Sequence, residues 1–216
     1  MKKIIIAEKP SVAQEYAKVL GVSAKNRQGF IENDTWIVTW TVGHLVTLSY
    51  PEKYNTVLKE WKMDTLPFIP DNYKYEIIDV TKKQFEVVKS LYNRPDISTI
   101  YYAGDSGREG LYIQMLVRML AGHNPQAQEK VVWINSQTED EILNGISEAK
   151  SLTEYKNMSD AGYMRGIADY LVGINFSRIL SILYAPMLNT GSSQKNRVPI
   201  SIGRVMTCVL GMVVRR

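Results

Sequence analysis

The 216-residue sequence contains one cysteine, Cys208, and two histidines. A single cysteine excludes both an internal disulfide framework and a cysteine-rich zinc site. No uninterrupted apolar run reaches the ~18 residues of a membrane-spanning helix, so we expect no membrane partner. The basic start is followed by an apolar run that ends at Glu8, which is too short for a signal peptide. We therefore expect a reduced, cytoplasmic setting and a buried Cys208.

What the sequence does contain is typical of a globular protein. Hydrophobic residues make up 45% and charged residues 22% of the chain, and this length can bury a core without disulfides or a structural metal. The net charge of +4 mildly favours an anionic partner. Apolar residues 205–214 are followed only by Arg215 and Arg216, without a helix-stop signal. We therefore expect these residues to be part of a longer protein.

Strand and helix patterns alternate over the first 150 residues. Apolar and β-branched runs predict strands at 3–7, 75–80, 98–103 and 131–134 and a hairpin at 28–42, and periodic patterns predict helices at 11–20, 82–92, 107–121 and 138–149. Ser11 with Gln14 and Thr138 with Glu141 have capping-box spacing. Strands separated by amphipathic helices predict an α/β fold, with a mostly parallel sheet covered by helices on both faces.

Two other stretches have a different character. Residues 49–74 keep no steady period, so we expect a long ordered loop that buries Trp61, Leu66, Phe68 and Ile69. After residue 150 we expect only helices, at 159–188 and 202–214. The predicted organisation is an α/β domain over residues 1–150 followed by an all-α segment over residues 151–216.

Acidic residues follow two of the predicted strands. Glu8 and Lys9 follow the first strand, and the strand at 98–103 leads into Asp105, Arg108 and Glu109. Because parallel strands end at the same sheet edge, these groups can face one point. Clustered carboxylates suit Mg²⁺, and neighbouring basic side chains suit a phosphodiester. Acidic residues and glycines at such turns also serve as helix caps and turn formers.

The glycine-rich loop at 104–110 also allows other classes of site to be judged. Gly-Asp-Ser-Gly at 104–107 is similar to the nucleophile loop of trypsin-like serine proteases, with His44 as a conceivable base, but those proteases are all-β. The glycines match neither the dinucleotide-binding fingerprint nor the P-loop. The sequence therefore gives no support for an ATP site.

The motifs together resemble a known family. Glu8-Lys9-Pro10-Ser11 and the pattern Asp105-x-Gly107-Arg108-Glu109-Gly110 resemble the Toprim domain of topoisomerases and primases. Further motifs resemble type IA DNA topoisomerases, in particular the bacterial topoisomerase III group. They are Gly43-His44-Leu45 and the segments at 61–70, 133–138, 165–178 and 201–207.

This resemblance implies a set of roles. Mg²⁺ would be the cofactor, bound by Glu8, Asp105 and Glu109; Glu8 would be catalytic, and Lys9 would hold the scissile phosphate. Further contacts to single-stranded DNA would come from His44, Arg108, Arg165, Asp169, Arg178 and Arg204. Charges in the helical segment can equally form ion pairs on the surface. The implied partners are single-stranded DNA and the remaining domains of the same polypeptide, with no requirement for ATP.

The sequence departs from the family pattern in two places. Gly107 stands where the family has a second aspartate, which removes one carboxylate from the metal site. The family's nucleophile is a tyrosine in a Thr-Tyr-x-Arg-Thr-Asp motif, and none of the 13 tyrosines has that setting. We therefore expect an amino-terminal part of an enzyme that cleaves, passes and religates single DNA strands through a phosphotyrosine link. Alone, it should not relax DNA.

Two alternatives stay open. The chain could be a stand-alone Toprim nuclease or primase-like enzyme, or it could be a non-catalytic nucleic-acid-binding module. Residues 165–178 and 201–207 favour the topoisomerase, because they resemble topoisomerase sequence beyond the Toprim domain.

Overall fold

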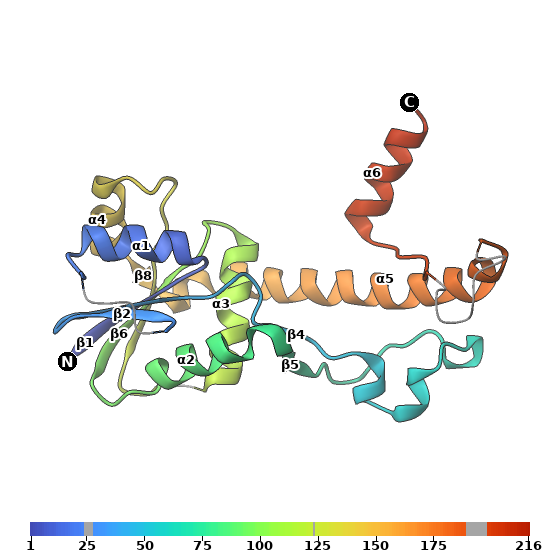
Figure 1. Ribbon diagram of the computed structural model, residues 1–216, viewed down its shortest axis with the longest axis horizontal. Coiled ribbons are helices and arrows are strands. Elements are labelled where there is room, and N and C mark those ends of the chain that lie inside the picture. Colours follow the sequence, from blue (N-terminus) through green and yellow to red (C-terminus); the bar gives the residue numbers. More distant parts are fainter. Residues whose placement is uncertain (24–27, 123, 189–197) are drawn as a thin grey trace. The chain divides into compact units, whose positions relative to one another are not determined.

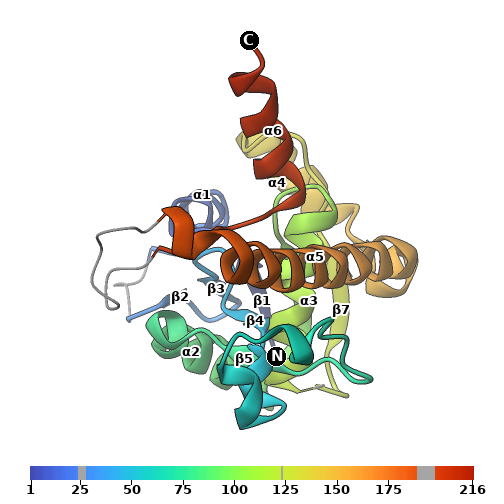
Figure 2. The same ribbon diagram turned by 90° about the vertical axis from the view of Figure 1, so that its right-hand side faces the viewer.

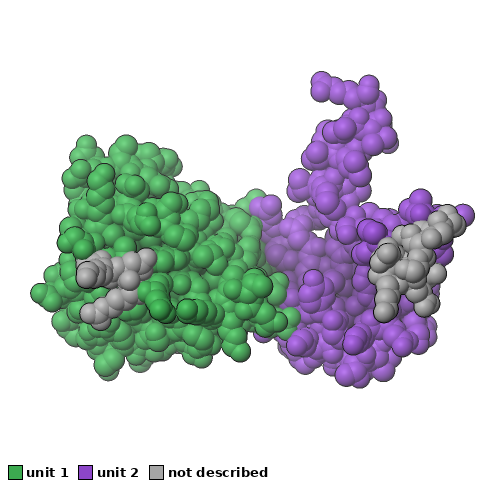
Figure 3. All heavy atoms as spheres, viewed as in Figure 1, with its two compact units in different colours: residues 1–47, 76–163 green, residues 48–75, 164–216 purple. Residues whose placement is uncertain are grey.

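The computed structural model describes residues 1–23, 28–122, 124–188 and 198–216. These residues form two compact units (Figure 3). Unit 1 comprises residues 1–47 and 76–163, and unit 2 comprises residues 48–75 and 164–216. The sequence pattern placed a single division near residue 150, whereas the segment 48–75 here belongs with the helical part of the chain.

Unit 1 is built on a six-stranded sheet. In spatial order its strands are β2 (Phe30–Glu32), β3 (Trp36–Trp40), β1 (Lys2–Ala7), β6 (Ile97–Ala103), β7 (Gln128–Val131) and β8 (Lys150–Ser151). The four central strands are parallel, and the edge strands β2 and β8 are antiparallel to their neighbours. This confirms the predicted mostly parallel sheet.

Helices cover both faces of this sheet. Helices α1 (Pro10–Val19) and α4 (Glu139–Ser147) lie on one face, and α2 (Lys82–Tyr92) and α3 (Arg108–Ala121) on the other (Figures 1 and 2). Side chains alternate along a strand, so Ile5 packs with Val12 and Ile142 on the α1 and α4 side. Residues 4–7 are at most 1% exposed. A strand buried on both faces explains why its sequence is a continuous apolar run.

The fourth central strand lies earlier than predicted. The apolar run at 131–134 was expected to be the strand, but β7 ends at Val131. The Val132 amide still donates to the Tyr102 carbonyl at 3.0 Å. The chain then packs beneath α4, where Val132 and Ile134 contact Ile142 and Gly145. This run is therefore apolar because a helix covers it. The short strand β8 was not predicted.

Both predicted capping boxes are wrong. Helix α1 begins at Pro10 with Lys9 as its N-cap, so Ser11 lies within the first turn. Proline suits this position because it has no amide hydrogen to leave unpaired. Thr138 is the N-cap of α4 without a side-chain cap, and the Glu141 carboxylate instead accepts a hydrogen bond from the Asn135 amide at 3.3 Å.

A buried carboxylate joins two helices to the sheet in unit 1. Oε1 of Glu129, on β7, accepts hydrogen bonds from the hydroxyls of Tyr92 (2.5 Å) and Tyr102 (2.7 Å). Arg118 of α3 binds the same carboxylate through two nitrogens, at 2.7 and 2.8 Å. Burial alone would raise the pKa of Glu129, but these donors outweigh it and lower the pKa to about 2.

Unit 2 joins irregular chain to long helices. The segment 48–75 lies between strands β4 (Val46–Leu48) and β5 (Tyr75–Ile77), which pair with each other, and it contains only the 3₁₀ turns η1 (Pro51–Lys53), η2 (Thr56–Lys59) and η3 (Met63–Thr65). The helices are α5 (Lys156–Leu188), which begins in unit 1, and α6 (Arg204–Val214). Further 3₁₀ turns, η4 (Asp79–Thr81) and η5 (Leu152–Tyr155), precede α2 and α5.

Side chains of α5 hold the irregular segment. Asn175 accepts a hydrogen bond from the Phe68 amide at 2.6 Å and donates one to the Phe68 carbonyl at 2.9 Å. The Tyr170 hydroxyl donates to the Ser49 carbonyl at 2.7 Å. The predicted ordered loop is confirmed, and Phe68 is buried. Trp61 and Ile69 are 42% and 66% exposed, so the expectation that they are buried was wrong.

The helices of unit 2 contradict one expectation, the burial of Cys208, and leave another, the lack of a membrane partner, as a prediction. By length and composition, residues 152–188 could cross a membrane, since one 18-residue window reaches a mean hydropathy of 1.5 with 22% of it buried. The core helix of a soluble protein meets the same criterion. Asp169 and Arg178 interrupt this stretch, so it contains no uninterrupted apolar run of 18 residues. Cys208 is exposed rather than buried, because α6 buries none of its residues against the described chain.

Candidate active site

Strand register brings three loops together at the carboxyl edge of the sheet. Ala7, the last residue of β1, is level with Ala103 of β6 and with Trp40 of β3. The loops that begin at Glu8, Thr41 and Gly104 therefore leave the sheet side by side. This edge is where ligands bind in open parallel sheets.

Glu8 is fixed between the two neighbouring loops. Its Oε2 accepts a hydrogen bond from the Asp105 amide at 3.0 Å. Its main-chain carbonyl accepts hydrogen bonds from the Thr41 hydroxyl at 2.9 Å and from the Gly43 amide at 3.3 Å. The residue is 7% exposed, so the carboxylate is held in one position rather than free in solvent.

Lys9 places a positive charge between two carboxylates. Its Nζ lies 3.2 Å from Oδ2 of Asp105 and 3.9 Å from Oε1 of Glu8. The hydrogen bond and charge of Asp105, with a smaller contribution from Glu8, raise the pKa of Lys9. Its side chain is 53% exposed. The result is an accessible ammonium group at the sheet edge.

The loop between β6 and α3 folds tightly onto the start of the helix. A Cβ atom on Gly110 would lie 2.1 Å from the Asp105 carbonyl oxygen and 2.7 Å from the Asp105 nitrogen, so this position requires glycine. The Ser106 hydroxyl donates to the Ile134 carbonyl at 2.5 Å and accepts from the Ile134 amide at 3.0 Å. The backbone of Asp105 is thus fixed from both sides.

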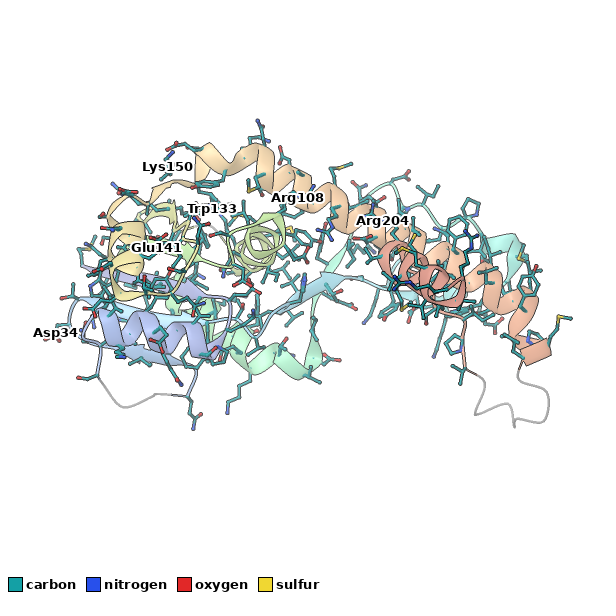
Figure 4. The ribbon with its side chains drawn as sticks, turned by 90° about the horizontal axis from the view of Figure 1, so that it is seen from above. Asp34, Arg108, Trp133, Glu141, Lys150 and Arg204 are labelled. Carbon is teal, nitrogen blue, oxygen red and sulfur yellow. The ribbon has the colours of Figure 1, made fainter. Side chains whose placement is uncertain are left out.

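Glu109 and His44 form a second pair at this edge. Nε2 of His44 lies 3.0 Å from Oε1 of Glu109, and the imidazole meets the Tyr112 ring edge-on at 6.0 Å. Arg108 is the first residue of α3, and its side chain is exposed (Figure 4). Sequence reasoning singled out His44 and Glu109 separately and did not foresee that they pair.

The donor atoms suit a hard cation in part. Glu8 and Asp105 converge on one positive charge, the Lys9 ammonium, and carboxylate oxygens are the ligands that Mg²⁺ prefers. Within the described residues, no group of three or more His, Cys, Asp or Glu side chains is close enough to hold a metal ion. The predicted set of Glu8, Asp105 and Glu109 therefore stays a prediction. A Cβ atom on Gly107 would meet no atom within 4 Å, which leaves room there for a larger side chain.

Comparison with known proteins identifies both parts of the chain. Residues 3–136 match the Toprim domain, and residues 153–216 match the DNA topoisomerase family. The chain belongs to the Toprim family. It is 41% identical over 194 residues to DNA topoisomerase 3 of Staphylococcus saprophyticus, which covers 90% of this chain and 27% of the relative. For DNA topoisomerase 3 of Bacillus subtilis the values are 38% over 215 residues, 100% and 28%.

This chain thus spans about a quarter of the length of these topoisomerase relatives. Its Toprim domain accounts for the sheet and for the loops that carry Glu8 and Asp105. Toprim domains bind divalent metal, which agrees with the carboxylates at the sheet edge.

The topoisomerase-matching segment carries the other predicted DNA-contacting residues. In unit 2, Asp169 of α5 pairs with Arg204 at the start of α6 (Figure 4) and lies 3.7 Å from Arg165. Arg178 is 3% exposed, donates to the Leu58 carbonyl at 2.9 Å and stacks over Trp61. A DNA contact by Arg178 would require its side chain to leave these partners.

Sequence reasoning missed three residues that support the site. Thr41 and Ser106 anchor the loops, as described above. Gln114 of α3 is 1% exposed and donates to the Ile6 carbonyl of β1 at 3.1 Å. A single polar residue within the apolar run at 111–117 is a signal that could have identified Gln114.

Proposed function

We propose that this chain forms the metal- and phosphate-binding part of a cytoplasmic enzyme that cleaves one strand of DNA, passes a second strand and religates the first. The observation that carries the proposal is the meeting of Glu8, Lys9 and Asp105 where β1 and β6 end. The residues lie 97 positions apart in sequence, yet one hydrogen bond joins Glu8 to Asp105. Two carboxylates and an exposed ammonium are the groups needed to bind a phosphodiester beside a metal.

Each side chain has a role that follows from its position. Lys9 donates to an oxygen of the scissile phosphate, because its ammonium is accessible and stays charged. Glu8, fixed by the Asp105 amide, serves as the proton-transfer group at the cleaved bond. Glu8, Asp105 and Glu109 would hold Mg²⁺, which would supply positive charge to offset the charge that develops on the phosphate.

The substrate we propose is single-stranded DNA. Further contacts to the DNA come from His44 and Arg108 in unit 1 and from Arg165, Asp169, Arg178 and Arg204 in unit 2. The net charge of +4 suits this role, and binding should weaken as salt rises because each phosphate contact releases counterions.

Covalent chemistry also requires a nucleophile. Attack by a tyrosine on the phosphodiester conserves the energy of the broken bond in a phosphotyrosine link, so the reaction needs no ATP. The Thr-Tyr-x-Arg-Thr-Asp motif does not occur in these 216 residues. We propose that other domains of the same polypeptide supply the tyrosine, and that this chain by itself does not relax supercoiled DNA.

Titration calorimetry with Mg²⁺ tests the metal site directly. The variants E8Q and D105N keep side-chain volume while removing charge, and each should weaken binding by about tenfold or more. D34N is the matched control, since Asp34 lies in the exposed turn between β2 and β3, away from the carboxyl edge (Figure 4). Equal affinity in all four proteins would refute the metal site. Metal-dependent DNA hydrolysis without a covalent link would support a stand-alone nuclease instead.

A further inference from the structure

A cavity of about 460 Å³ adjoins the proposed phosphate position in unit 1. We call it the Tyr16 cavity. Val12 and Tyr16 of α1 form part of its lining, together with Asp105 and Ser106 of the loop after β6 and with Asn135 and Gln137 of the segment before α4. Its volume falls in the ~300–1,000 Å³ range of small-molecule sites.

Three polar side chains of the Tyr16 cavity make no hydrogen bond with another described residue. Tyr16 is 1% exposed, and its hydroxyl makes no hydrogen bond with another described residue. Asn135 and Gln137 are exposed, and their side-chain amides have no hydrogen-bond partner within the described chain. The Tyr16 hydroxyl is not among the buried side-chain atoms of the described residues that lack a partner, so it is open to the cavity. A ligand in the cavity would replace water as the hydrogen-bond partner of these three side chains.

Charge restricts the class of ligand. No Lys, Arg or His is among the described residues that line the cavity, and its one charged residue is Asp105. A phosphate or carboxylate would therefore meet repulsion without compensation. A neutral molecule that both donates and accepts hydrogen bonds fits better. The edge of a nucleobase has this pattern, and carboxamide side chains pair with such edges through two hydrogen bonds.

The position of the cavity beside Lys9 indicates which part of the DNA it receives. Asp105 lines the cavity and also lies 3.2 Å from the Lys9 ammonium, where we place the scissile phosphate. A nucleotide attached to that phosphate is thus beside the opening. We propose that the Tyr16 cavity receives the base of a nucleotide flanking the cleaved phosphate, and that Asn135 and Gln137 read its edge. This inference rests on the proposed function of Lys9.

Short oligonucleotides test the inference with the 216-residue chain itself. The probes are the four single-base trinucleotides and a trinucleotide whose middle nucleotide is abasic, titrated while the side-chain amide signals of the protein are followed by NMR. The best-bound base should bind about tenfold more tightly than the abasic probe. The signals of Asn135 and Gln137 should shift only with the intact probes.

Variants separate the base contact from the phosphate contact. The double variant N135A/Q137A should bind intact and abasic probes equally, and N144A, an exposed asparagine on α4 outside the cavity, should keep the tenfold difference. K9A should weaken both kinds of probe by the same factor. If intact and abasic probes bind equally to the unmodified protein while K9A still weakens both, the base-binding inference is refuted and the proposed function stands. If K9A changes neither affinity, the proposed function of Lys9 is refuted. The assignment of the cavity to a flanking nucleotide is then refuted as well, because it rests on that function.

Discussion

Gly110 offers the sharpest test of how the loop after β6 positions Asp105. In G110A the new Cβ would start 2.1 Å from the Asp105 carbonyl oxygen and 2.7 Å from its nitrogen. Ordinary contacts are ~3.5 Å, so the backbone of Asp105 must move by more than ~1 Å. The hydrogen bond from the Asp105 amide to Glu8, now 3.0 Å, would then be lost.

The expected cost follows from two opposing effects. Losing a hydrogen bond to a charged acceptor costs about 1.5–3 kcal/mol. Alanine in place of glycine stabilises a helix by up to ~1 kcal/mol, and Gly110 lies within α3. The net loss is therefore about 0.5–2 kcal/mol, which for a chain of this size lowers Tm by roughly 1–8 °C. Affinity for Mg²⁺ should fall by about tenfold, since two carboxylates lose their fixed separation.

The same loop provides the control. A Cβ on Gly107 meets no atom within 4 Å, and its φ of 179° is extended backbone that alanine adopts. G107A should keep wild-type Mg²⁺ affinity and lose less than about 1 kcal/mol of stability, the difference between glycine and alanine as an N-cap. Calorimetric titration and thermal unfolding of both variants give the comparison. Wild-type affinity and Tm in G110A would refute the tight fit of the loop.

Three further predictions concern other parts of the molecule. G107D should bind Mg²⁺ more tightly than the unmodified chain, because the position has room for the missing carboxylate. G107N caps the helix without adding charge, so it should bind Mg²⁺ no more tightly. Equal titration curves for G107D and G107N would contradict this prediction. The lowered pKa of Glu129 adds about 3 kcal/mol of stability above pH 4.5, and this stability is lost as pH falls through 2. Thermal unfolding at several pH values should show a weaker pH dependence in E129Q, while the exposed-site control E148Q should keep it. Parallel curves of Tm against pH for all three proteins would refute this contribution. N175A leaves the buried Phe68 amide and carbonyl without their side-chain partner. Limited proteolysis should therefore cut the segment 48–75 faster in N175A than in the control N157A, which changes an exposed asparagine on the same helix. Equal cleavage rates would mean that Asn175 does not hold this segment.

The sequence predicted the fold best where burial allows only one type of secondary-structure element. Strand β1 contains a continuous apolar run, and β6 is buried at all but one position, so their type and place could be predicted. Parallel pairing then put Glu8 and Asp105 at the same edge. Helix α2 was predicted to the residue because its apolar side chains follow the helical period on one face.

The features that could not be predicted depend on contacts between distant residues. The run at 131–134 is apolar because α4 packs on it. A local sequence pattern cannot distinguish such a run from a strand. The capping boxes failed because Pro10 and Asn135 offered the helix starts other arrangements. The association of segment 48–75 with α5 depends on Asn175, whose partner Phe68 lies 107 residues away.

The parallel register of β1 with β6 also has a kinetic consequence. The chain that links these strands contains β2, β3 and α2, and closing so long a loop is entropically costly and slow. Before β6 pairs with β1, Glu8 lacks the Asp105 amide that fixes its carboxylate, and Lys9 lacks its contact with the Asp105 carboxylate. A refolding chain would therefore gain its affinity for metal only when the centre of the sheet closes. Metal uptake followed during refolding would time that closure.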